Sequence, residues 1–210
     1  MSRTLKLLAA LLIATAGFLL LRHYRSDPSK NGTEVNGQMA TTNNVTNLHE
    51  WREFSSDTGR FKVLLPTLPQ HVTDMYADPK TREQRKYETF VAAGDNGAAF
   101  MISAITFPNN LDADNGEETL KSAVADMLAR NKDNKLNKME VGKFRNQKAI
   151  DFSLSNSDLK IVGKVFSHNN ILYILSMINK DSTFNGKEFD FFINSFDFVD
   201  NTRAPNGAKK

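Results

Sequence analysis

Cysteine is absent from all 210 residues of the chain. This absence excludes disulfides, thiolate metal sites, thiol nucleophiles and lipid attachment through cysteine. Glycine and proline, with 11 and 6 residues, show no periodic spacing, which excludes a fibrous protein. With 40% hydrophobic and 10% aromatic residues, the composition is that of a globular chain rather than a disordered one.

The motifs of common catalytic and metal sites are also missing. There is no G-x-S-x-G elbow, and the glycine-containing segment 94–97 lies in a predicted hairpin instead of opening a helix. Acidic residues between 112 and 118 resemble the first half of a calcium loop, but its central glycine and distal glutamate do not follow. No two of the four histidines have metal-ligand spacing: His23, His49, His71, His168. We therefore expect no enzymatic activity, no cofactor and no metal.

The basic charge of the chain belongs to its ends. The formal net charge is +3 and the isoelectric point is near 9.0. Residues 1–25 carry +4, residues 26–49 carry −1 and residues 201–210 carry +3, so residues 50–200 carry −3. A mildly acidic folded part argues against nucleic acid as a partner.

The N-terminal segment predicts a membrane anchor. Leu7 to Leu21 is an uncharged run of 15 residues, which as a helix spans only about 22 Å of a hydrocarbon core about 30 Å thick. Lys6 and Arg22, which can snorkel, and an interfacial Tyr24 extend the membrane contact to residues 5–24. We favour an uncleaved single-pass anchor over residues 1–25, with the globular domain exported from the inner (cytoplasmic) membrane to the periplasm or cell exterior.

Two other interpretations of this segment stay open. An A-x-A pattern at Ala14 and Ala16 is compatible with a cleaved export signal, although cleavage there leaves Phe18 and three leucines at the new terminus. The third interpretation is a buried helix of a soluble protein.

Composition places a linker and a tail around one domain. Residues 26–49 are rich in Asn, Thr, Ser and Gly and have almost no bulky apolar residue, which predicts a flexible polar tether. Residues 201–210 form a polar tail. The folded domain is therefore expected at residues 50–200, large enough for one hydrophobic core.

Alternating apolar residues and turn signals predict an antiparallel sheet in this domain. The first hairpin joins 51–54 to 60–65, with Gly59 expected in the left-handed conformation, and the second joins 84–93 to 98–107. The strand 98–107 is apolar on both faces and is expected at the centre of the sheet. Short loops join three further strands into a meander: 147–154, 159–167, 171–178.

Helical spacing of apolar residues predicts two helices. The first begins after a cap at Asn115 and carries apolar residues to Leu128, followed by a solvated basic end containing Arg130, Lys132, Lys135 and Lys138. The second begins near Asn185 and is expected to bury Phe189, Phe192, Ile193 and Phe196. Phe196 and Phe198 are alternatively a short closing strand. The pattern indicates an α+β fold, an antiparallel β-sheet flanked by helices.

Three parts of the sequence resemble PsbP-like proteins, a class of small bacterial envelope proteins and their relatives. The resemblance lies in W-x-x-F-S-S-x-x-G-R-F-x-V-x-L-P at 51–66, I-L-Y-I-L at 171–175 and F-I-N-S-F at 192–196. Lys164-Val165-Phe166 departs from the usual Arg-x-Tyr of that class. The resemblance implies an α/β/α sandwich and a non-enzymatic binding role, as in the extrinsic photosystem subunit and a Ran-binding import factor. The shared motif forms the fold, so it assigns no functional residues.

These observations lead to two hypotheses of function. The first is a membrane-tethered, exported binding or accessory domain for an envelope protein complex, in which an exposed apolar patch including Phe191 contacts the partner protein. The alternative is a small-ligand carrier with a pocket between sheet and helix, lined by Arg60, His71 or Tyr87. An enzyme ranks third, because a hydrolase needs a polar triad that the sequence does not offer.

Overall fold

The computed structural model describes residues 47–77, 82–111 and 116–199. The anchor and the tail expected from the sequence, and most of the linker, lie outside these residues. The first described element is a short 3-10 helix, η2 (Leu48–Glu50), and Leu48 packs against the core. The described part of the domain therefore starts three residues before Glu50, the first residue expected from the sequence.

The domain contains two antiparallel sheets. The small sheet has the order β1-β2-β10 and the large one the order β3-β4-β5-β9-β8-β7-β6. The strands of the small sheet are β1 (Arg52–Ser56), β2 (Phe61–Leu65) and β10 (Asp197–Phe198). Those of the large sheet are β3 (Gln70–Ala77), β4 (Gln84–Ala93), β5 (Ala99–Thr106), β6 (Lys135–Phe144), β7 (Gln147–Asn156), β8 (Leu159–His168) and β9 (Ile171–Lys180).

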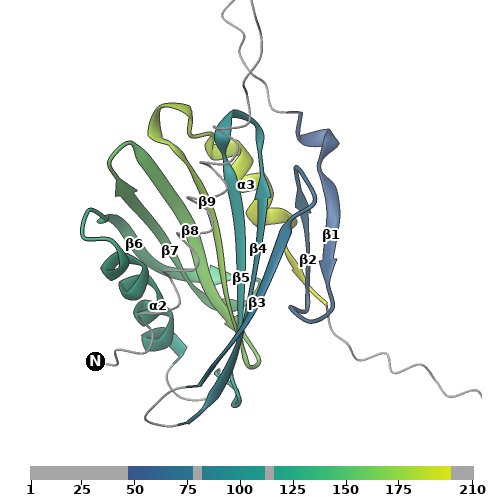
Figure 1. Cartoon of the computed structure of the whole chain (residues 1–210), viewed down its shortest axis with the longest axis vertical. Helices are drawn as coiled ribbons and strands as arrows, with labels where there is room; N and C mark the ends of the chain where they lie inside the picture. The colour runs from purple at the N-terminus through teal and green to yellow at the C-terminus, as the bar shows by residue number, and fades with distance from the viewer. Residues whose placement is uncertain (1–46, 78–81, 112–115, 200–210) are drawn as a thin grey trace, which may run out of the picture.

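Each face of the large sheet has its own cover (Figure 1). Helix α2 (Gly116–Arg130) packs on β7 and β8 on one face. Helix α3 (Gly186–Ser195) and the small sheet pack on the other face, where α3 contacts β2 and β9. The predicted α+β fold with an antiparallel sheet between helices is thus confirmed, and β5 lies in the interior of the sheet, as expected.

The two layers create two hydrophobic cores. The core on the α3 side is rich in aromatic residues and includes Phe61, Phe100, Phe166, Tyr173, Phe192 and Phe196. The core on the α2 side is mainly aliphatic, and its members include Leu120, Val124, Ile150, Phe152 and Leu172. Because side chains alternate along a strand, each central strand supplies both cores. The second predicted helix, α3, buries Phe192 and Ile193, and its Phe189 is partly buried. Phe196 directly follows the helix and is fully buried, and Phe198 belongs to β10, the short closing strand.

Two strands at the margins of the large sheet were not expected from the sequence. Residues 70–77 form β3, and His71 lies on this strand. Residues 135–144 form β6, so Lys135 and Lys138 belong to a strand and not to the basic end of the helix, which ends at Arg130. The two strands lie at the two edges of the sheet and bury few side chains, so apolar residues mark them less strongly than they mark the interior strands.

The turn of the first hairpin also differs from expectation. Arg60, with φ of 53°, and not Gly59, adopts the left-handed conformation. Glycine is needed at 59 for another reason, because a Cβ there would lie 2.7 Å from Cε1 of Phe61. Asn169, in the turn between β8 and β9, has a positive φ of 54°, a conformation that asparagine tolerates.

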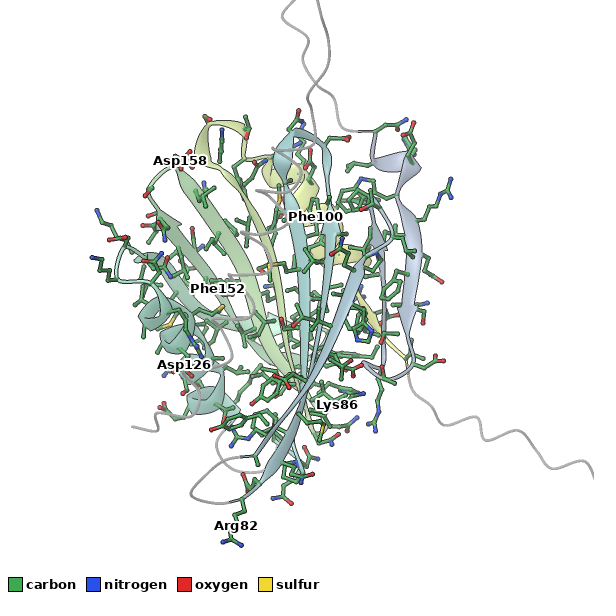
Figure 2. All side chains as sticks on the ribbon, in the orientation of Figure 1. Arg82, Lys86, Phe100, Asp126, Phe152 and Asp158 are labelled. Carbon is green, nitrogen blue, oxygen red and sulfur yellow. The ribbon has the colours of Figure 1, made fainter. Side chains whose placement is uncertain are left out.

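Gly163 of β8 lets the α2-side core close against the sheet. It pairs with Phe152 of β7, and a Cβ on Gly163 would lie 2.3 Å from Cζ of Phe152 and 2.7 Å from the backbone oxygen of Leu175. The phenyl ring therefore occupies the space over Gly163. Phe152 is 1% exposed and packs in the core beneath α2 (Figure 2).

We predict that Gly163→Ala lowers the free energy of unfolding by about 3 kcal/mol, since the methyl group forces Phe152 out of its position. Gly142→Ala in β6 is the matched control, because its nearest neighbour is an Asp151 oxygen 3.9 Å away. Urea denaturation of both variants checks this, and equal stability of the two would contradict the role assigned to Gly163.

Candidate functional site

A buried carboxylate lies where the turn between β1 and β2 meets the large sheet. Glu88 of β4 is 1% exposed. Thr58 Oγ1 donates a hydrogen bond of 2.6 Å to Glu88 Oε1. Nε2 of His71 on β3 lies 3.3 Å from the same oxygen, and Lys86 Nζ lies 3.1 Å from Oε2. The carboxylate is therefore stabilised by three side chains from three segments of the chain.

A tyrosine two strands away fixes the same turn. Tyr173 of β9 is fully buried, and its hydroxyl donates a hydrogen bond of 2.8 Å to the Gly59 carbonyl oxygen. Burial raises the pKa of the Tyr173 phenol strongly; Arg60 lowers it and the Glu88 carboxylate raises it by smaller amounts. Glu88, Ala104 and Tyr173 are neighbours in register on β4, β5 and β9, so they form one row on the face that carries the small sheet.

The geometry of His71 does not support a catalytic relay. A relay histidine contacts the carboxylate through one ring nitrogen and the nucleophile through the other. Here Nε2 faces both Glu88 and the Thr73 hydroxyl, at 3.3 and 3.2 Å. The imidazole ring also stacks on Phe90, with ring centroids 4.2 Å apart and planes 4° from parallel. The cluster is thus suited to fastening the small sheet to the large one.

The sheet separates the residues expected to line one pocket. His71 and Glu88 lie on the face covered by the small sheet, and Arg60 lies in the turn docked there. Tyr87 is the neighbour of Glu88 in sequence, so its side chain points to the opposite face of the sheet. There it packs in the α2-side core, with its ring centroid 6.5 Å from that of Tyr76. His71 therefore contacts the Glu88 carboxylate, Arg60 lies in the turn that Thr58 links to it, and Tyr87 lies on the other face.

Phe191 covers the end of the aromatic core. Its ring meets Trp51 edge to face with centroids 5.4 Å apart, and Trp51 in turn contacts Phe100 at 4.8 Å. Phe191 is partly buried and packs against the core. Within the described residues, the large apolar side chains with the greatest exposure lie elsewhere: Leu68, Val72, Met75, Leu136, Met139, Val141.

These exposed side chains gather at the two edges of the large sheet. Val72 and Met75 lie on β3, 40% and 58% exposed, and Leu68 precedes that strand. Leu136, Met139 and Val141 lie on β6. Sequence reasoning missed both surfaces. A signal for β3 was present, since Val72, Thr73 and Tyr76 favour strands and stand between Pro69 and Pro79.

The described residues give no direct support for a metal site or a membrane span. They contain no group of three or more His, Asp and Glu side chains arranged to hold a metal ion. None of the helices among them is both long enough and apolar enough to span a membrane.

Comparison with known proteins finds similar structures but no similar annotated sequence. No protein-family model matches the chain, and no curated protein matches it. The solution structure of cyanobacterial PsbP from Synechocystis is 14% identical over 82% of this chain and 98% of that one, with a TM-score of 0.47. It belongs to the class that the sequence resembles.

A crystal structure from Bacteroides thetaiotaomicron is also similar. It is 14% identical over 72% of this chain, with a TM-score of 0.37, and the match spans about half (49%) of that longer chain. Both likenesses concern the shape of the fold and assign no function.

We predict that Tyr173→Phe changes the pH dependence of stability. Because burial raises the phenol pKa above its ordinary value of 10.0, the unfolded chain ionises first, and stability falls as the pH rises above that value. At pH 7 the variant is less stable by about 1 kcal/mol, for the lost hydrogen bond to Gly59. From pH 10 to 11 the advantage of the wild type shrinks by about 1 kcal/mol.

Urea denaturation at pH 7, 10 and 11 measures this difference. A stability difference that stays constant across the three pH values would contradict a buried, un-ionised Tyr173.

Proposed function

We propose that this chain is a membrane-tethered, exported binding module that serves an envelope protein complex without catalysing a reaction. The observation that carries the proposal is the outer edge of β3. Residues 5–24 hold the protein in the membrane, and the folded domain presents β3 to a partner protein. The partner contributes an extended segment that pairs with this edge.

The edge of β3 has the properties of a strand that accepts another strand. It pairs with β4 in unbroken register over eight residues, and all of them are exposed apart from the partly buried Tyr76. Edge strands are protected by charged side chains, especially lysines, and by prolines and bulges. The described strand Gln70–Ala77 has no lysine, proline or bulge, and Asp74 is its one fully charged residue. Such an edge offers backbone hydrogen bonds for affinity and alternate side chains for specificity.

A tether makes a modest interface of this kind sufficient. The polar linker outside the described domain, 26–46, has 21 residues, and a flexible chain of that length has a root-mean-square span of roughly 25 Å. The domain therefore stays close to the membrane, where the effective concentration of an envelope partner is high. A carrier of small ligands is supported less well, because the sheet separates Tyr87 from Arg60 and His71.

We predict that a photoreactive phenylalanine analogue placed at Val72 crosslinks the full-length chain to one protein partner in its own membranes. The additional change Met75→Lys, which places a lysine on the edge as natural edge strands do, is expected to reduce the yield at least tenfold. The same analogue at Val141 of β6, which is 54% exposed, is the matched control and gives no protein adduct.

Two results would contradict the proposal. One is the absence of any protein adduct from Val72, and the other is an adduct that forms equally well with and without Met75→Lys.

A further inference from the structure

The apolar residues of the α2-side core continue onto the exposed face of β6, beyond the strands on which helix α2 packs. Met139 and Val141 stand opposite Phe152 and Ile150 of β7, and Leu136 stands opposite Leu154. The three β7 side chains are buried, whereas their β6 neighbours are 42%, 54% and 42% exposed for Met139, Val141 and Leu136. Helix α2 packs on β7 and β8, and β6 is the edge strand beyond β7. The apolar stripe is therefore Leu136, Met139 and Val141.

Two lysines extend this stripe on the same face. Lys143 of β6 stands directly opposite Lys148 of β7 in register, and both are exposed. Like charges in directly opposite positions repel each other and destabilise a hairpin. The pKa of Glu117 is lowered mainly by its hydrogen bond with Lys121, whose Nζ lies 2.7 Å from Glu117 Oε1. The charge of Lys148 lowers this pKa by a smaller amount. Neither Lys143 nor Lys148 forms an ion pair within the described ranges. An anion at this position would relieve the repulsion.

The charge of this hairpin is opposite to that of the domain. Residues 135–148 contain five basic residues and one acidic residue, a net charge of +4, whereas residues 50–200 as a whole carry −3. The acidic residue is Glu140, which lies 2.9 Å from Lys138 on the strand. A partner for this surface must therefore be negatively charged and must accept aliphatic side chains.

The edge of β6 is protected against strand addition, unlike that of β3. The register of β6 against β7 shifts between Leu136 and Lys138, which marks a bulge. Lys135, Lys138 and Lys143 line the strand. Bulges and lysines are the features that prevent edge-to-edge pairing. The surface that β6 offers to a partner is therefore its side-chain face and not its backbone edge.

We propose that the stripe and its two lysines dock the domain onto the surface of an anionic bilayer. The aliphatic side chains enter the interfacial region, and Lys143 and Lys148 lie among the lipid phosphates. Three half-exposed side chains are too few for a stable protein interface, which buries about 800 Å² on each partner. A bilayer contact needs less area when a tether already holds the domain at the membrane, so this inference rests on the tethering part of the proposed function.

Full-length protein in lipid nanodiscs tests the docking. The chain has no cysteine, so Val141→Cys provides one site for a nitroxide label whose collisions with oxygen and with a water-soluble nickel complex report its depth. Val72→Cys, on the opposite edge strand and 40% exposed, is the matched control. Discs of neutral phosphatidylcholine are compared with discs that contain equal parts of phosphatidylcholine and phosphatidylglycerol.

The label at 141 is expected to lie in the interface in anionic discs and in water in neutral discs, while the label at 72 stays in water in both. The pair Lys143→Gln and Lys148→Gln is expected to lower the ratio of docked to undocked domain about 30-fold, since each lysine near an anionic surface contributes about fivefold. The control pair Lys62→Gln and Lys187→Gln removes two charges from β2 and α3, on the other face of the large sheet. It is expected to leave the ratio of docked to undocked domain within about twofold of the wild-type value.

Equal water access of the label at 141 in both kinds of disc would overturn the docking. Protection that appears only when proteins from the native membrane are added would also overturn it, because it shows that a protein covers the stripe. Failure of the chain to remain with the disc overturns the tether instead. In that case the same chain is sedimented with preformed vesicles of the two compositions, and equal recovery with both overturns the docking.

Discussion

The large sheet is wider than the layers that cover it, and most other features of the molecule follow from this mismatch. Seven strands need cover on both faces, but α2 packs on β7 and β8, and α3 with the small sheet covers the middle of the other face. The interior strands are consequently buried on both faces: β9 is buried in every residue except Lys180. The edge strands receive cover on few residues, and this is where large apolar side chains meet solvent.

The attachment of the small sheet depends on polar contacts made inside this core. Glu88 and Tyr173 are both buried, and each bonds the β1–β2 turn, the first through Thr58 and the second through Gly59. A buried carboxylate without partners costs several kcal/mol, so its hydrogen bonds favour a single position of the turn. Arg145 adds a further link by donating to the carbonyl oxygens of Asn194 and Phe196 at the end of α3. The covered middle of the sheet is thereby fixed in one arrangement, whereas the edge strands β3 and β6 stay largely exposed.

The sequence predicted the elements that bury side chains and missed those that do not. The strands β4, β5, β7, β8 and β9 were expected within two residues of their observed bounds, because apolar alternation and turn residues mark them. These signals are weaker in β3 and β6, whose residues are nearly all exposed. The same limit applied to the site. Arg60 and His71 were identified as candidates, but Glu88 was not, since a glutamate within a strand ordinarily indicates a solvent-facing position. Tyr87 does not join them, because consecutive residues of a strand lie on opposite faces of the sheet and Glu88 faces the small sheet.

Amide hydrogen exchange of β3 tests most directly the proposed pairing of its edge with a protein partner at the membrane. In an antiparallel pair, alternate amides of a strand point to its neighbour, so half of the β3 amides face away from β4. Exchange is compared between the full-length chain in its native membranes and the same chain purified in detergent. The account predicts that alternate amides in Gln70–Ala77 exchange at least tenfold more slowly in the native membranes. Equal exchange rates of these amides in the two preparations would contradict it.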